Sequence, residues 1–233
     1  MKLSRDVTNK INWILDNIIP PFIRDSRLFS VPLLWFLFRK NTKMFMEFKN
    51  KVPVLSNEDI VQYYKKLGKA HIKRDTDLNI DCINYILNNL SGKVILDIAC
   101  GRGYLAKMIV EKCGLNVVGI DFVVDNKLAD SINPVFTEGN VENIPFPDKS
   151  FDTVICTHTL EHVVDIQKCI NELRRVCKNQ LIVVLPKQRP YKYTFDLHVH
   201  FFPYRFNVLN LFKNKDAKCF CIKNDWLYHE TVQ

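Results

Sequence analysis

Short apolar segments alternate with amphipathic ones over most of the chain. Between the apolar segments, residues 105–112 and 166–176 place apolar side chains at helical spacing. Two further runs, residues 217–223 and 226–231, flank Asn224-Asp225, a pair suited to a two-residue hairpin turn. The pattern predicts a mostly parallel α/β sheet that ends in an antiparallel hairpin. The apolar runs, rich in β-branched residues and typical of buried parallel strands, are residues 94–98, 116–121, 134–137, 151–156 and 180–185.

Helices are predicted before the first strand. Apolar residues from Val7 to Ile18 share one helical face, and Pro20-Pro21 ends that helix. A second helix starts near Ser56 and carries Ile60, Tyr64, Leu67 and His71 on one face. A third occupies residues 77–90 and is stopped by Ser91-Gly92.

The run Leu28–Phe38 is the most apolar part of this helical region. It is too short to span a bilayer and contains Pro32. Trp13, Trp35 and the flanking Arg39-Lys40 suit a membrane interface, which makes residues 1–50 a candidate for peripheral membrane contact. The alternative is an apolar lid over the catalytic domain.

Composition limits the class of protein. The apolar fraction of 47% supports a real core, and the net charge of +8 is concentrated in residues 1–80. The eight cysteines are scattered, with neither a C-x-x-C pair nor zinc-type spacing, so we expect reduced thiols and no metal site. Reduced thiols indicate a cytoplasmic protein, which could also lie peripherally at the membrane.

The first strand leads into a glycine-bearing turn, Asp97-Ile98-Ala99-Cys100-Gly101-Arg102-Gly103, and then a helix. Such a turn presents backbone N–H groups to a ligand, and glycine allows the ligand to lie directly on the backbone. A dinucleotide fingerprint requires a third glycine where Ala106 stands. Asp97 would repel a pyrophosphate but suits an ammonium group, which disfavours a nicotinamide-dependent oxidoreductase.

The second strand ends in Asp121. A carboxylate at this position can accept hydrogen bonds from both ribose hydroxyls of a nucleoside held at the glycine turn. The neighbouring Phe122 can pack on an adenine or on a helix.

These features together resemble class I S-adenosylmethionine-dependent methyltransferases, and most closely the ubiquinone-biosynthesis-like group. The resemblance rests on Asp97-x-x-Cys100-Gly101-x-Gly103, on Asp121, and on the Pro145-Phe146-x-Asp148-x-Ser150-Phe151-Asp152 lead into the fourth strand. It implies a Rossmann-like α/β sheet of seven strands in residues 77–233, preceded by a basic helical extension or lid in residues 1–76. The implied cofactor is S-adenosylmethionine, with S-adenosylhomocysteine as product. The implied cofactor contacts are Asp97, Ala99, Cys100, Gly101, Gly103, Asp121, Phe122, Asn140, Val141 and Thr157.

Four histidines are candidates for a base on the acceptor side: His158, His162, His198 and His200. A base is useful where the methylated group is a hydroxyl that must lose its proton. His158 and His162 follow the fourth strand, where a histidine or a glutamate in this group often lies next to the cofactor. His198 and His200 follow the fifth strand, where acceptor specificity usually resides in the family. Structural roles for these histidines are the alternative.

The acceptor implied by the resemblance is a small molecule or a glycan- or lipid-linked group, methylated on oxygen or nitrogen. An RNA methyltransferase that uses the basic extension as a phosphate-binding arm is a second hypothesis. A third is a non-catalytic partner subunit that keeps the cofactor pocket, although the intact acids and glycines argue against decay.

Overall fold

The structure is a computed structural model that describes residues 5–55, 59, 62–63, 75–193 and 196–232. Most of the helix predicted after Ser56, including Ile60, Tyr64, Leu67 and His71, lies outside these residues. The chain divides into two compact units. We call residues 1–74 with 188–203 the helical unit, and residues 75–187 with 204–233 the sheet unit.

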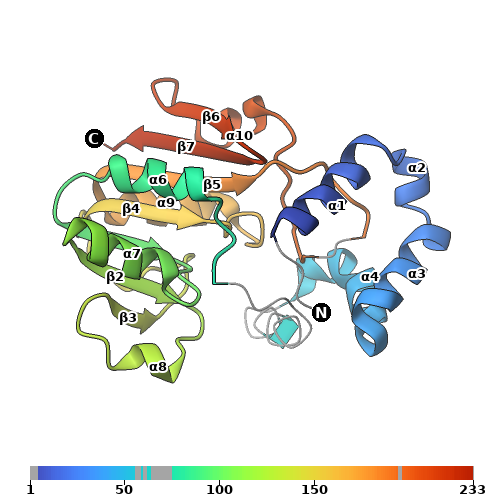
Figure 1. The fold of residues 1–233 in the computed structure, drawn as a ribbon, viewed down its shortest axis with the longest axis horizontal. Helices are drawn as coiled ribbons and strands as arrows, with labels where there is room; N and C mark the ends of the chain where they lie inside the picture. The colour runs from blue at the N-terminus through green and yellow to red at the C-terminus, as the bar shows by residue number, and fades with distance from the viewer. Residues whose placement is uncertain (1–4, 56–58, 60–61, 64–74, 194–195, 233) are drawn as a thin grey trace. The chain divides into compact units, whose positions relative to one another are not determined.

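The sheet unit contains a seven-stranded sheet in the order β3-β2-β1-β4-β5-β7-β6 (Figure 1). The first five strands are parallel, and β7 runs antiparallel between β5 and β6. This order confirms the predicted class I sheet with its carboxy-terminal hairpin. The strands are β1 (Val94–Ile98), β2 (Asn116–Asp121), β3 (Val135–Glu138), β4 (Phe151–Thr157), β5 (Cys177–Pro186), β6 (Lys218–Ile222) and β7 (Asp225–Thr231).

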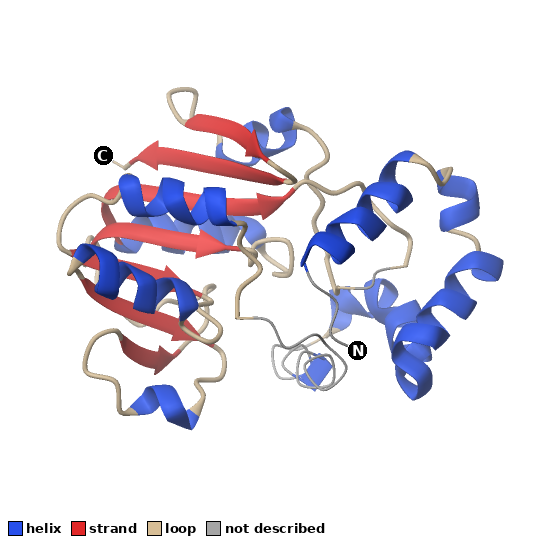
Figure 2. Cartoon of the chain, in the orientation of Figure 1, coloured by secondary structure: helices blue, strands red, loops and turns tan. Residues whose placement is uncertain are grey.

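Helices cover both faces of this sheet (Figure 2). On one face, α6 and α7 pack against β1, β4 and β5 through a core that includes Ile86, Ile95, Ile109 and Ile155. On the other face lies α9, whose apolar stripe is completely buried because it follows helical spacing. The helices of this unit are α6 (Ile80–Asn88), α7 (Tyr104–Cys113), α8 (Asn126–Ala129), α9 (Ile166–Val176) and α10 (Arg205–Phe212).

Parallel pairing brings the carboxyl ends of three strands to one edge. Ile98, the last residue of β1, is aligned with Ile120 of β2 and with Cys156 of β4. The loops that leave β1, β2 and β4 therefore start side by side, which is where open α/β sheets bind their ligands.

The hairpin turn differs from the prediction by one residue. Ile222 of β6 pairs with Asp225 of β7, so the two turn residues are Lys223 and Asn224 rather than Asn224-Asp225. Lys223 adopts a φ of 56°, as a tight hairpin turn requires. As a consequence Asp225 is the first residue of β7, and its side chain is buried instead of exposed in a turn.

The helical unit has its own apolar core. Leu34 and Phe38 of α3 pack with Phe45 and Phe48 of α4 and with Leu197 from the segment after β5. Pro20-Pro21 separates α1 from α2 as predicted, with Pro21 at the first helical position of α2. None of the described helices is long and apolar enough to cross a membrane. The elements are α1 (Arg5–Asn17), α2 (Pro21–Arg24), α3 (Arg27–Phe38), η1 (Arg39–Asn41), α4 (Thr42–Lys51) and η2 (Val52–Val54).

Candidate functional site

The turn between β1 and α7 is held by its own backbone. Three of its residues, Ala99, Gly101 and Gly103, have positive φ angles of 55°, 56° and 69°. The Cys100 N–H donates to the Ile120 carbonyl at 3.0 Å, which fixes the turn to the end of β2. Helix α7 begins immediately after Gly103, so its first N–H groups lie at this turn.

The two glycines of the turn serve different purposes. A Cβ on Gly103 would lie 2.3 Å from Cζ of Phe136, so a protein side chain requires this glycine, in addition to its positive φ. A Cβ on Gly101 would have no atom within 4 Å. Gly103 thus has a structural reason of its own in addition to the predicted cofactor contact, while the backbone at Gly101 is open.

Asp121 lies against this open backbone. Its Oδ2 accepts a hydrogen bond from the Gly101 N–H at 2.7 Å. Burial raises the pKa of Asp121, and hydrogen bonds from the backbone of Gly101, Val123 and Phe122 oppose that rise. The carboxylate at the end of β2 is thus directed to the glycine turn, as the sequence predicts.

Asp97 is a second acid beside the same turn and is only 2% exposed. Burial, together with the charge of Asp121, raises the pKa of Asp97 to about 7, against a hydrogen bond from the Ala106 backbone. No basic side chain of the described residues forms an ion pair with either acid. A buried carboxyl and a partly exposed one, next to an open backbone, fit a ligand that carries an ammonium group and hydroxyls, as S-adenosylmethionine does.

The other predicted cofactor contacts lie in the loops that follow the parallel strands. Phe122 follows β2 and is 38% exposed, whereas Val141, after β3, is 5% exposed. The side-chain carbonyl of Asn140 accepts the Glu142 N–H at 2.9 Å, which shapes that loop. Thr157 ends β4. Backbone topology therefore places all the predicted cofactor residues at the same end of the sheet as Asp97 and Asp121.

The loop after β4 contains a buried charged cluster that we call the His158 cluster, formed by His158, Glu161, Asp225 and Asn79. The Nδ1 of His158 lies 3.4 Å from Glu161, and its Nε2 lies 3.6 Å from Asp225. The Asn79 amide donates to the other Asp225 oxygen at 2.8 Å. The cluster connects the β4 loop with the start of β7 and the amino end of α6.

The neighbouring carboxylates determine the protonation state of His158. Burial by itself opposes a charged imidazole, but Asp225 and Glu161 outweigh it and raise the pKa of His158 to about 10. At neutral pH the ring is a cation without a free lone pair, so it suits a positioning role in this loop better than the role of a base. Its φ of 49° fixes the direction of the loop as it leaves β4.

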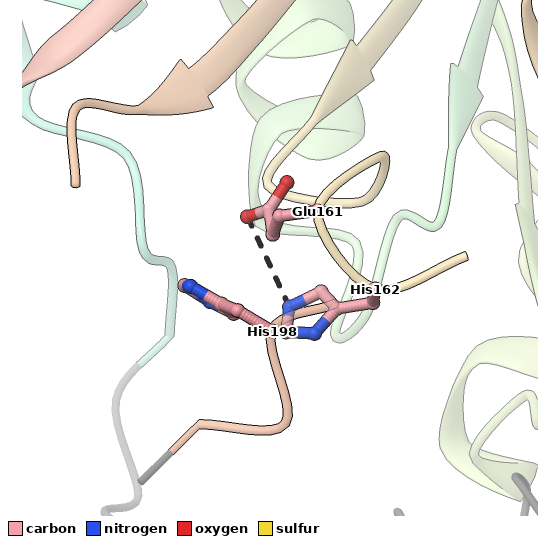
Figure 3. A group of neighbouring side chains, drawn as sticks. All are labelled: Glu161, His162 and His198. Atoms are coloured by element: carbon pink, nitrogen blue, oxygen red, sulfur yellow. Dashed lines mark ion pairs between the residues drawn. The ribbon is translucent and has the colours of Figure 1, made fainter. Parts of the chain in front are cut away.

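Sequence reasoning did not identify Glu161 and Asp225. Glu161 lies between two histidines in the chain and is 1% exposed, and its Oε1 is 3.9 Å from Nε2 of His162 (Figure 3). A carboxylate between two histidines was the available signal for Glu161. Nothing near Asp225 in the sequence indicates its partner, because that partner, His158, lies in the distant loop after β4.

The remaining predicted histidines belong to the helical unit, whereas His158 and His162 belong to the sheet unit. The Nδ1 of His198 is hydrogen-bonded to Oε1 of Gln188 at 2.5 Å, and its Nε2 lies 3.6 Å from Asp196. His198 is buried and His200 is partly exposed.

Comparison with known proteins finds relatives of the sheet unit. Residues 96–185 match the sequence family described as "Methyltransferase domain". The demethylmenaquinone methyltransferase of Thermus thermophilus is 35% identical over 114 residues, which are 45% of this chain and 52% of that protein. The ubiquinone biosynthesis O-methyltransferase of Rickettsia bellii is 26% identical over 149 residues, 55% of this chain and 61% of that protein.

The chain thus matches a little more than half the length of these two relatives. Among solved structures, the PH0226 protein of Pyrococcus horikoshii is similar in fold, with a TM-score of 0.53 and 17% identity over 84% of this chain and 100% of that one. Family, strand order and fold agree with the resemblance carried by Asp97, the glycine turn and Asp121. Residues 96–185, within the sheet unit, thus form a class I S-adenosylmethionine-dependent methyltransferase domain.

Proposed function

We propose that this protein transfers a methyl group from S-adenosylmethionine to a small-molecule, glycan- or lipid-linked acceptor, on oxygen or nitrogen. The observation that carries the proposal is the pair of acids around the open backbone of Gly101, of which Asp97 is buried and Asp121 is partly exposed and accepts the Gly101 N–H. The names of the two relatives, which act on quinone precursors by those names, support a small acceptor.

Each acid has a distinct part in cofactor binding. Asp121 accepts hydrogen bonds from the ribose hydroxyls, and Asp97 stabilises the ammonium of the methionine portion. Gly101 leaves space for the ligand, and Phe122, Asn140 and Val141 contact the adenine. The cofactor itself supplies an electrophilic methyl on sulfur, so the protein mainly contributes proximity and orientation.

The four candidate histidines on the acceptor side differ in charge state and in the unit to which they belong. His158 is the cation that positions the loop after β4, held between Glu161 and Asp225. His162 is 22% exposed beside Glu161 and is the candidate in the sheet unit to take a proton from an acceptor hydroxyl. His198 and His200 remain the candidates for acceptor contacts from the helical unit.

Isothermal titration of the full chain with S-adenosylmethionine and S-adenosylhomocysteine tests this function. We expect micromolar binding, weakened about 100-fold or more by Asp121→Ala because a charge-assisted hydrogen-bonding group is lost from a buried site. Asp121→Asn keeps an acceptor for the Gly101 N–H and should lose less, and the exposed Asp130→Ala should bind like the natural protein.

Absence of cofactor binding by the folded natural chain would refute the proposal. Binding without methyl transfer to a panel of demethylated quinones, phenols and sugars would instead favour the non-catalytic partner subunit. Radiolabelled methyl groups counted in the product fraction distinguish these two results.

A second proposal, that the helical unit contacts a membrane surface, rests on exposed apolar side chains of α2 and α3. Phe22 is 78% exposed, Leu28 91% and Phe36 59%, and Arg39-Lys40 follow at the end of α3. Apolar side chains with flanking cations suit the interface of an anionic bilayer. Cosedimentation with phosphatidylglycerol vesicles should fall several-fold in Leu28→Ser/Phe36→Ser, and unchanged cosedimentation would refute this contact.

A further inference from the structure

The helical unit contains a partly open cavity of about 430 Å³. Its volume is within the range of pockets that hold small molecules. Three segments form it: α3, α4 and the chain after β5. The lining residues are Arg27, Val31, Lys43, Met46, Glu47, Lys49, Asn50, Lys192 and Tyr193.

One face of α4 supplies much of the wall. Lys43, Met46, Glu47 and Asn50 follow helical spacing and therefore share a face. The neighbouring positions Phe45 and Phe48 are each 1% exposed in the core of this unit, so packing fixes which face of α4 lines the cavity. Packing of α4 in the core therefore fixes this part of the cavity wall, which does not depend on flexible side chains alone.

The lining carries four basic side chains and one acid. That acid, Glu47, is already engaged: Lys51, which is not part of the lining, lies 2.8 Å from it, and Lys43 lies 3.8 Å from it. In the described part of the chain, no carboxylate is ion-paired with the side chain of Arg27 or Lys192. The cavity therefore has an excess of positive charge that its own acid does not neutralise.

Lys49 is partly buried, whereas the other three bases of the lining are exposed. Its ammonium donates to the Tyr191 carbonyl and lies 4.1 Å from the ring centroid of Phe201. Burial lowers the pKa of Lys49 to about 8, although Asp196 and Asp25 counteract the effect. The amine is still mainly charged at neutral pH, and its partly desolvated charge would interact more strongly with an anion than a fully hydrated one.

We propose that this cavity binds the phosphate group of a small organic phosphate or of a lipid head group. Four basic residues in the lining, one of them with a guanidinium, favour a multiply charged oxyanion over a single carboxylate. Val31, Met46 and the Tyr193 ring supply apolar surface for the organic part of the ligand. This site belongs to the helical unit and does not depend on methyl transfer.

Binding of octyl phosphate to the full chain, measured by isothermal titration in low-salt buffer, tests the site directly, with octanol as the uncharged comparison. We expect binding of octyl phosphate but not of octanol. Arg27→Gln/Lys192→Gln should weaken octyl phosphate binding about tenfold or more, because two charge-assisted contacts are lost. Lys112→Gln/Lys215→Gln removes the same charge from exposed positions of the sheet unit and should leave binding unchanged.

Vesicles identify the source of the phosphate. If the protein cosediments with phosphatidic acid vesicles, and if this binding is lost in Arg27→Gln/Lys192→Gln and in the presence of octyl phosphate, the ligand is a lipid head group. If octyl phosphate binds but does not compete with the vesicles, the ligand is a soluble phosphate. The proposal is overturned if octyl phosphate does not bind, or if both double variants bind it equally. Titration with S-adenosylmethionine in the same variants should be unchanged, so failure of this site is separable from failure of the proposed methyl transfer.

Discussion

Two loops leave neighbouring strands of the sheet unit at the same edge, and different forces shape them. The turn after β1 is held by backbone geometry: positive φ angles at Gly101 and Gly103, and backbone N–H groups that donate to Ile120 and Asp121. The loop after β4 is held by charge, with the His158 ring between two buried carboxylates. The conformation of the turn after β1 depends on the φ angles that its residues can adopt. The conformation of the loop after β4 depends on the ion pairs between His158 and the two carboxylates.

This difference determines how each loop should respond to substitution and pH. A backbone-held turn should lose stability when a side chain is added, with little dependence on pH. A charge-held loop should lose stability when its cation is removed, and by an amount that follows the titration of that cation. The predictions below test the two loops separately, and the largest effect is expected at the glycine turn.

Gly103→Ala should destabilise the protein by about 3 to 4 kcal/mol, because a positive φ of 69° and a Cβ placed 2.3 Å from Phe136 add their costs. Gly114→Ala is the matched control: its φ is 66°, but a Cβ there meets no atom within 4 Å, so about 1 kcal/mol is expected. Urea unfolding of both variants measures the difference. Equal losses would mean that the Phe136 ring moves aside, and that contact with Phe136 is not what requires a glycine at position 103.

The same contrast explains what the sequence could and could not predict. Glycines mark positions that only they tolerate, and Asp121 ends an apolar run, so the turn and its acid were predictable from local residue types. The α/β class and the carboxy-terminal hairpin followed from apolar runs alternating with helical periods, whereas the strand order was implied by the resemblance to class I methyltransferases. The reason for Gly103 was not predictable, because Phe136 is on another strand.

The His158 cluster was not predictable from neighbouring residues either, because its members are also far apart in the sequence. Its ion partner Asp225 is far along the chain, and the sequence predicts Asp225 in the hairpin turn and not in β7. Only the register of β6 and β7, with Ile222 opposite Asp225, brings that carboxylate into the interior. A one-residue shift in a turn thus decided whether a site residue could be recognised.

His158→Gln should cost about 3 kcal/mol near pH 6, because it leaves two buried carboxylates without their cation. The pKa of His158 is about 10 in the folded chain and about 6.5 when unfolded, so its contribution is complete below pH 6.5 and is lost as the pH rises towards 10. The stability difference between natural protein and variant should therefore shrink over that interval.

His229→Gln provides the comparison for this prediction, because burial lowers the pKa of His229 and Lys218 adds to that effect. Its stability cost should not decrease between pH 6.5 and 10. Urea unfolding at several pH values, with NMR titration of the imidazole signals, gives both results. A His158 ring that titrates near neutral pH would contradict the charge-held loop.

The smallest effect is expected at Asp97, where the backbone-held turn carries a charge of its own. A raised carboxyl pKa means that the folded chain binds the proton more tightly, so stability is highest below the unfolded pKa and falls as the pH rises through about 7. An ammonium ligand favours the ionised carboxylate, so S-adenosylmethionine affinity should rise about fivefold from pH 6 to 7 and fall again above about 8, where an α-amino group loses its proton. Asp97→Asn should remove the rising limb, as followed by isothermal titration. If the rising limb persists in this variant while Asp121→Asn abolishes it, the titrating acid is Asp121, and Asp97 is a buried neutral carboxyl that does not hold the ligand's charge.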